Sequence, residues 1–133
     1  MAFYKKQKIK GKWYPRSFTV GTFTTDDVAN RLSARSTVTK GDTYAVLLGL
    51  GDVLADMLET GCSVKLDGVG TFFLVGKATG RGADKPEDVS PRQFTKLGVG
   101  FIPEYHRGHN NRVTRRTIVP QHVNWTELEG EVK

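Results

Sequence analysis

The segment 42–60 constrains the fold most strongly, because its apolar residues fall on almost every side of the helix that their spacing predicts. One side carries Tyr44, Leu47, Leu48, Leu54, Ala55 and Leu58. Much of another side carries Val46, Leu50, Val53 and Met57. A helix that is apolar on so many sides is buried on as many sides. A chain of 133 residues with one other clear helix cannot cover it alone, so we expect a partner chain to do so.

Short polar signals predict where the helices begin and end. Residues 24–27 (Thr-Thr-Asp-Asp) supply a capping hydroxyl and two acids for a first turn, which predicts a helix over about 26–35. Residues 39–42 (Thr-Lys-Gly-Asp) have the spacing of a capping box in front of the apolar helix, with Asp in place of the usual Glu or Gln. Gly61 is expected to end that helix, because glycine readily adopts the left-handed backbone that follows many helices.

The other segments predict short strands. Residues 3–20 alternate loosely, are rich in β-formers and contain a Lys-Gly turn, which predicts a hairpin. Residues 63–76 predict two strands around a turn, and residues 97–102 predict a third strand. A polar, basic connection over 76–96 joins the second strand to the third. The predicted class is therefore α+β.

Charge is segregated along the chain. Residues 1–16 carry six bases and no acid, and residues 76–122 carry nine bases against four acids. Residues 17–75 have a net charge of −3 and the last eleven residues have −2, which gives +6 in total. A surface that binds a polyanion needs such segregation, whereas a solvated surface does not. Basic segments also serve solubility or bind acidic proteins, so both interpretations stay open.

The sequence contains no constellation that predicts catalysis. It has no Ser-His-Asp order, Walker loop or Cys-x-x-Cys pair, so we expect no enzyme, cofactor, metal or small-molecule substrate. Its single cysteine, Cys62, cannot form an internal disulfide, which fits a reducing cytoplasm. No stretch approaches the roughly 20 apolar residues of a membrane span, and no apolar segment follows the first lysines as in a secretory signal. We therefore expect a cytoplasmic protein with no membrane partner.

Two motifs at a specific spacing carry a family resemblance. Residues 64–72 contain Gly68-x-Gly70-x-Phe72, and Phe101-Ile102-Pro103 follows later in the chain. Behind two helices, this order resembles the HU / integration host factor family of bacterial histone-like DNA-binding proteins. Residues 13–17 (Trp-Tyr-Pro-Arg-Ser) are similar to the opening of an HU-related subgroup with an N-terminal extension. The resemblance covers roughly residues 13–105.

The resemblance implies an intertwined homodimer with a helical base, and with a three-stranded antiparallel sheet and an arm in each chain. The predicted domains are a basic hairpin extension (1–23), an HU-like DNA-binding domain (24–105, arm about 76–96) and a basic, then acidic tail (106–133). The implied function is that of a nucleoid-associated architectural protein in the bacterial cytoplasm. Such a protein binds and condenses double-stranded DNA through phosphate-backbone and minor-groove contacts.

The candidate site residues follow from the resemblance and from the charge pattern. The expected DNA-binding residues are the bases of the arm and tail with one arm proline: Lys77, Arg81, Lys85, Pro86, Arg92, Lys96, Arg107, Arg112, Arg115 and Arg116. The expected dimer interface consists of apolar residues: Tyr44, Leu47, Leu48, Leu50, Val53, Leu54, Met57, Leu58, Phe72 and Phe101. The lysines of the first hairpin either meet DNA or keep an exposed strand edge from aggregating.

The arm departs from the family's pattern. The family's arm tip usually reads Arg-Asn-Pro, and that proline wedges into the minor groove. Here three acids surround Pro86, and residues 90–94 (Ser-Pro-Arg-Gln-Phe) predict a helical turn. One alternative is therefore a structural or protein-interaction protein on an HU scaffold, with a modified arm and weak or no DNA bending. A second alternative, suggested by the aromatic residues of the first twenty positions, is binding to single strands or RNA.

Overall fold

The structure is a computed structural model that describes residues 1–78 and 80–132. The chain divides into two compact units. The first unit comprises Met1–Leu48 together with the residues from Pro120 onward, and the second comprises Gly49–Val119. Helix α2 (Lys40–Glu59) contributes its first part to one unit and its remainder to the other.

The sheet of the first unit has the order β2-β1-β8. Strands β1 (Ala2–Ile9) and β2 (Lys12–Phe18) form the predicted antiparallel hairpin. Its turn uses left-handed backbone at Lys10 (φ +50°) and Gly11 (φ +80°), which is the conformation that suits the twist of a tight hairpin. Strand β8 (Trp125–Val132) lies parallel to β1, where the sequence predicted only an acidic tail. The prediction was wrong here because a parallel partner so distant in sequence leaves no local turn signal.

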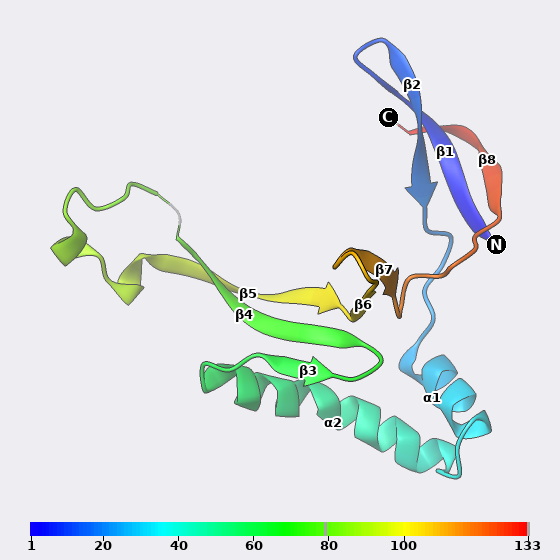
Figure 1. Cartoon of the computed structure of the whole chain (residues 1–133), viewed down its shortest axis with the longest axis horizontal. Helices are drawn as coiled ribbons and strands as arrows, with labels where there is room; N and C mark the ends of the chain where they lie inside the picture. The colour runs from blue at the N-terminus through cyan, green and yellow to red at the C-terminus, as the bar shows by residue number, and fades with distance from the viewer. Residues whose placement is uncertain (79, 133) are drawn as a thin grey trace. The chain divides into compact units, whose positions relative to one another are not determined.

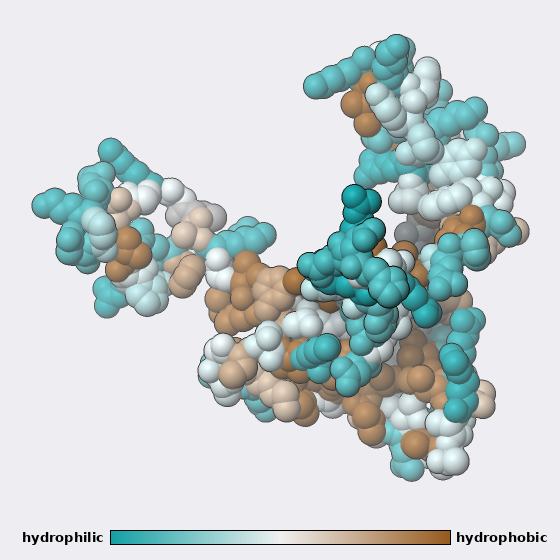
Figure 2. All heavy atoms as spheres, in the orientation of Figure 1, coloured by the Kyte–Doolittle hydropathy of each residue, from teal (hydrophilic) through white to brown (hydrophobic). Residues whose placement is uncertain are grey.

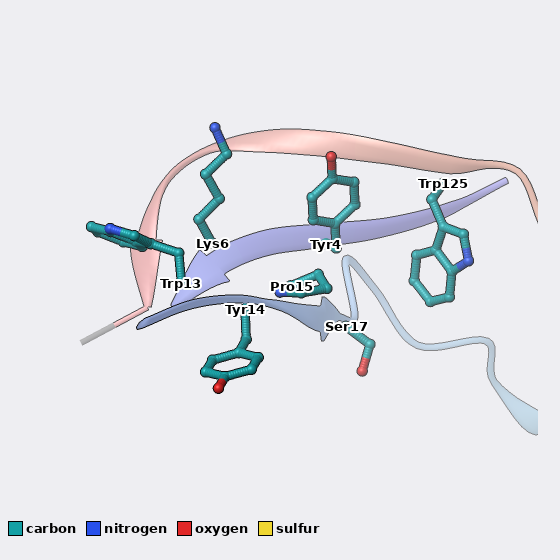
Figure 3. Close-up of a pocket in the computed structure, with 7 residues that line it drawn as sticks. All are labelled: Tyr4, Lys6, Trp13, Tyr14, Pro15, Ser17 and Trp125. Carbon is teal, nitrogen blue, oxygen red and sulfur yellow. The ribbon is translucent and has the colours of Figure 1, made fainter. Parts of the chain in front are cut away.

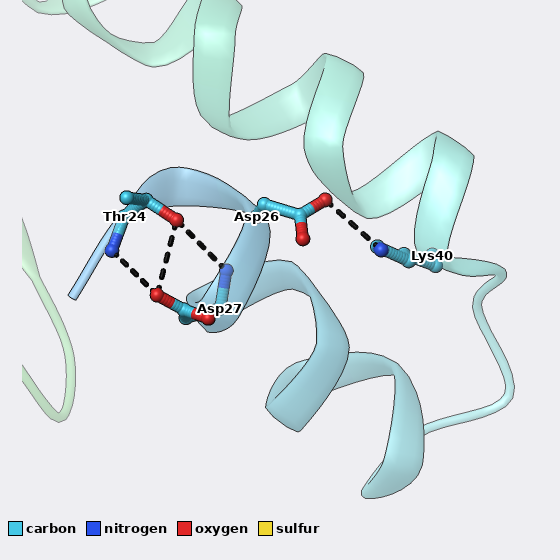
Figure 4. A network of polar contacts seen from close by, with 4 residues as sticks. All are labelled: Thr24, Asp26, Asp27 and Lys40. Atoms are coloured by element: carbon cyan, nitrogen blue, oxygen red, sulfur yellow. Dashed lines mark hydrogen bonds and ion pairs between the residues drawn. The ribbon is translucent and has the colours of Figure 1, made fainter.

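Helix α1 (Thr25–Ala34) begins at the predicted cap (Figure 4). The Thr24 hydroxyl accepts a hydrogen bond from the Asp27 backbone N–H (3.4 Å), and the Asp27 carboxylate accepts one from the Thr24 N–H (2.9 Å). The Thr24 hydroxyl also donates to the Asp27 carboxylate (3.1 Å), and the two bonds from the Thr24 N–H and hydroxyl favour the charged carboxylate and lower the pKa of Asp27. Lys40, at the start of α2, forms an ion pair with Asp26 (2.9 Å). The cap of α1 therefore lies at Thr24, as predicted, and the reciprocal bond with Asp27 makes it a capping box, which the sequence predicted only for residues 39–42.

The sheet of the second unit has the order β3-β4-β5 and is antiparallel throughout. Its strands are β3 (Val64–Leu66), β4 (Gly70–Ala78) and β5 (Phe94–Pro103). Gly61 follows α2 with φ +90°, as predicted for the residue that ends that helix. Strand β5 begins three residues earlier than predicted, so β4 and β5 form a longer ribbon (Figure 1).

The arm beyond this ribbon contains two 3₁₀ turns, η1 (Pro86–Asp88) and η2 (Pro91–Gln93). The second turn confirms the helical turn predicted for residues 90–94. The Ser90 hydroxyl accepts a hydrogen bond from the Arg92 N–H (3.1 Å), and the Ser90 N–H donates to the Gln93 side chain (2.9 Å). Proline at the first position of each turn needs no N–H partner there, which explains why each turn begins where it does.

The segment after β5 forms a hairpin, where the sequence predicted a basic loop or tail. Strands β6 (Tyr105–Arg107) and β7 (Val113–Arg116) pair antiparallel. Glu104 anchors the hairpin, because its carboxylate accepts a hydrogen bond from the Thr117 hydroxyl (2.6 Å) and its backbone N–H donates to the Val69 carbonyl (3.0 Å). The prediction was wrong because the glycine and asparagines at 108–111, weak helix formers, were not recognised as a hairpin turn.

The chain buries little apolar surface by itself. Among the residues described, Ala29 and Leu58 are the only buried apolar side chains. On α2, Val46 is 69% exposed and Leu48 is 60% exposed. Figure 2 shows apolar residues lying at the surface of the face in view. Within residues 1–78 and 80–132, no helix has the length and apolar character that crossing a membrane requires.

Candidate nucleic-acid interface

The ribbon of β4 and β5 has two chemically different faces, which the strand register defines. Paired residues lie on the same side of an antiparallel sheet, and successive pairs alternate between sides. One face carries apolar pairs and extends along the ribbon as Phe72–Phe101, Leu74–Val99 and Gly76–Leu97. The other, which we call the flat face, carries Thr71–Ile102, Phe73–Gly100, Val75–Gly98 and Lys77–Lys96. Only the flat face presents charge.

Two glycines reduce the side-chain bulk on the β5 side of the flat face. Phe73 lies over Gly100, where an added Cβ would overlap its ring. A Cβ at Gly98 would meet nothing within 4 Å, so this position is open to an approaching molecule. At the other end of the ribbon, Gly70 has φ +156° and its Cβ would overlap the Ile102 carbonyl oxygen. Gly70 is thus needed for the close approach of β4 and β5, whereas Gly68 supplies left-handed backbone (φ +81°) in the turn before β4.

A pair of lysines dominates the electrostatics of the flat face. Lys77 and Lys96 are direct cross-strand partners, and both are exposed. Like charges directly opposite one another destabilise an antiparallel pair. A phosphate group placed between or above the two ammonium groups would remove that repulsion. The ribbon therefore carries a destabilising feature that an anionic ligand would relieve.

The other predicted arm residues lie in or beside the irregular segment that follows β4. Arg81 precedes the first 3₁₀ turn, Lys85 caps it, Pro86 is its first residue, and Arg92 lies in the second turn. All four are exposed. Within residues 1–78 and 80–132, no carboxylate forms a salt bridge with any of the nine predicted DNA-binding bases. Their charges are thus not neutralised by the ion pairs found in the described part of the chain.

The bases after β5 are brought together by the β6–β7 hairpin. His106 lies opposite Arg115, and Tyr105 lies opposite Arg116. The Arg107 guanidinium donates to the Asn111 carbonyl (2.7 Å) and lies 4.9 Å from the centre of the Tyr105 ring. Arg107 is therefore held in place by the hairpin turn, whereas Arg115 and Arg116 are exposed residues of β7. Sequence reasoning identified these bases but missed the hairpin that groups them.

The predicted dimer-interface residues divide by exposure. Leu58 is already buried within the chain. Partial burial is found at Leu47, Leu50, Leu54 and Phe72, and exposure at Tyr44, Leu48, Val53, Met57 and Phe101. The Phe72 and Phe101 rings pack against each other across the strands, with centroids 4.8 Å apart. The exposed members leave α2 and the apolar face of the ribbon without full cover.

Comparison with known families identifies the domain. The family model for an HU domain fused to a wHTH, Ig or glycine-rich motif, HU-HIG, matches residues 2–112. The chain belongs to the HU-HIG family. This confirms the HU resemblance and the α+β class, and the match includes the N-terminal hairpin as well as the HU-like part.

A solved structure supports the HU-HIG fold. It is a protein from Bacteroides vulgatus ATCC 8482 that is provisionally described as a bacterial DNA-binding protein. The two align with a TM-score of 0.52 at 16% sequence identity, over 75% of this chain and 41% of that chain. At this identity the likeness shows the fold alone, and this chain spans about two fifths of that protein's length. No curated protein matches the sequence.

Proposed function

We propose that this HU-HIG protein binds double-stranded DNA as an architectural, non-catalytic homodimer. The observation that carries the proposal is the Lys77–Lys96 pair on the flat face of an HU-like ribbon. Two opposed ammonium groups near the open position of Gly98 match the charge of a phosphate backbone and leave room for its approach. Binding of this kind depends on counterion release and carries little sequence preference of its own.

The exposure of apolar side chains supports the proposed dimer. Helix α2 exposes Val46, Leu48, Val53 and Met57, and the ribbon exposes Leu74, Leu97 and Val99. Apolar side chains that gather on an exposed face of a helix or a ribbon mark surfaces that other proteins cover. A second copy that covers α2 and the apolar face with the same residues forms an isologous interface, and it leaves the flat faces of both ribbons for DNA.

The arm supports backbone contact more strongly than sharp bending. Asp84, Glu87 and Asp88 flank Pro86, and carboxylates beside phosphates are unfavourable. We therefore assign the main contacts to Lys77, Lys96 and the bases of the β6–β7 hairpin, with minor-groove insertion of Pro86 as a weaker feature. The expected location is the bacterial nucleoid.

The acids of the arm also motivate a second candidate function, in which the HU scaffold binds a protein through a modified arm. Charge reversal at Lys77 and Arg81 separates the two candidates. It weakens DNA binding in the first candidate, and leaves the DNA affinity unchanged in the second.

The decisive test is fluorescence anisotropy of a labelled duplex of about 30 base pairs, titrated with the full chain at several salt concentrations. The proposal expects binding at low salt, with a log–log salt slope of several units. A duplex that stays unbound at low salt overturns it. Sedimentation velocity on the same protein, without DNA, tests the homodimer separately.

A further inference from the structure

The N-terminal sheet contains a cavity that the proposed function does not use. It has a volume of about 610 Å³ and lies within the first unit (Figure 3). Strands β1, β2 and β8 supply its lining: Tyr4, Lys6, Trp13, Tyr14, Pro15, Ser17 and Trp125. Both tryptophans of the chain are among these residues. The volume falls in the range of sites that bind small molecules or single groups of a larger ligand.

The strand register explains why these side chains meet. Trp13, Pro15 and Ser17 pair with Lys8, Lys6 and Tyr4, so all six belong to one face of the hairpin. Trp125 is the partner of Ala2, which lies on the same face of β1 as Tyr4. In Figure 3, Tyr14 projects from β2 in the opposite direction to Trp13 and lines the rim.

The aromatic rings of this cavity are open to solvent. Trp13 is 52% exposed and Trp125 is 54% exposed. Tryptophan is a residue that folded proteins usually cover to a large extent, because its ring contributes a large apolar area. The two half-exposed indoles lie at opposite ends of the cavity (Figure 3), and each offers a flat ring on which an aromatic ligand could stack.

Basic residues lie in and beside the cavity. The Lys8 ammonium lies 5.8 Å from the centre of the Trp13 ring. Lys6, which lines the cavity, forms an ion pair with Glu127 (3.1 Å), so its charge is compensated within the sheet. On the other face, Lys5 lies opposite Arg16, a second like-charge pair. Residues 2–18 and 125–132 together carry six bases and three acids, a net charge of +3. The ligand that complements this module is aromatic and anionic.

We propose that the cavity binds an unpaired base of a single-stranded nucleic acid, with the surrounding lysines on its phosphates. Stacking platforms combined with a positive surface are the general means by which proteins bind single strands. In a duplex the bases are stacked on one another and unavailable to the indoles. A proline-rich peptide also suits aromatic grooves, but it carries no charge that explains the lysines. The site is separate from the flat face, so the inference does not depend on the proposed duplex binding.

Tryptophan fluorescence tests the site directly, because both tryptophans line it. We expect oligo(dT) or oligo(rU) of about 12 nucleotides to quench the emission of the full chain at low salt, and the two probes separate DNA from RNA. The Trp125→Ala variant is expected to weaken binding of the labelled strand about tenfold or more. Trp125→Phe, which keeps a ring, is expected to restore most of the affinity. Phe23→Ala, at a 70% exposed ring outside the cavity, is the matched control and leaves the affinity unchanged.

Duplex binding by the same variants separates this inference from the proposed function. The Trp125→Ala variant is expected to have the same affinity for duplex DNA as the unmodified chain. The inference is overturned if neither oligonucleotide quenches the emission, or if a proline-rich peptide does so in their place. It is also overturned if the alanine and phenylalanine variants bind single strands equally well, because the ring then has no role.

Discussion

Neutralising the Lys77–Lys96 pair is expected to change DNA affinity and protein stability in opposite directions. Lys77→Gln removes one ammonium group from each chain, and so two phosphate contacts from each dimer. A salt slope of about 0.9 per phosphate predicts that the log–log slope falls by about 1.8. At an ionic strength of about 0.1 M, the same relation gives a loss in affinity of about 60-fold. If the protein bound as a monomer, the log–log slope would fall by only about 0.9, because one phosphate contact would be lost in place of two.

The free protein should respond in the other direction. Removing one of two opposed ammonium groups relieves the cross-strand repulsion, which raises the free energy of unfolding by about 0.3 kcal/mol. This energy lies at the low end of the range for cross-strand charge pairs, because both lysines are exposed to solvent. Thermal denaturation without DNA at low salt measures this gain, and added salt is expected to diminish it.

Lys40→Gln is the matched control, because it removes the same charge from the start of α2, where Lys40 pairs with Asp26. Its salt slope is expected to equal that of the unmodified chain. The reasoning is refuted if Lys77→Gln and Lys40→Gln reduce the slope equally, because net charge alone would then explain the effect. It is also refuted if Lys77→Gln leaves both slope and stability unchanged.

Three further outcomes are expected. Leu48→Asp places a charge on the exposed apolar side of α2, so sedimentation velocity should show monomers in place of dimers. Gly100→Ala forces Phe73 to move and is expected to cost about 1–3 kcal/mol in urea denaturation, whereas Gly98→Ala, with open space around it, costs little. Because the pKa of Asp27 is lower in the folded chain, its stabilising effect is complete above the ordinary aspartate range and is lost as the pH falls through the folded value. Asp27→Asn, which does not titrate, should therefore be less stable than the unmodified chain at neutral pH and approach it in acid.

Elements with local signals were predictable from the sequence. The capping hydroxyl and the two acids of residues 24–27 identified the start of α1, and Gly61 identified the end of α2. The Lys-Gly turn identified the first hairpin. In each case the residues that determine the geometry lie within a few positions of it, so the pattern is visible without knowledge of the rest of the chain.

Elements that depend on distant partners were not predictable in this way. Strand β8 pairs with β1, which lies more than a hundred residues earlier in the sequence. The alternating glutamates of β8 indicate by themselves only an exposed acidic segment. The arrangement of the candidate site shows the same limit. The sequence identified Lys77 and Lys96 as separate bases, but their direct opposition depends on the β4–β5 register. The aromatic cavity required both the hairpin register and Trp125.

The parallel pairing of β1 with β8 also has a consequence for the order of folding. Ala2 pairs with Trp125, so closing this sheet requires a loop of more than a hundred residues, and the entropy of closure grows with loop length. The second unit, Gly49–Val119, lies entirely within that loop and contains its own hairpins. On a ribosome, the second unit therefore emerges and is able to fold while β1 still has an unpaired edge. During that time the lysines of β1 would keep its unpaired edge from aggregating, until β8 has been synthesised and can pair with it.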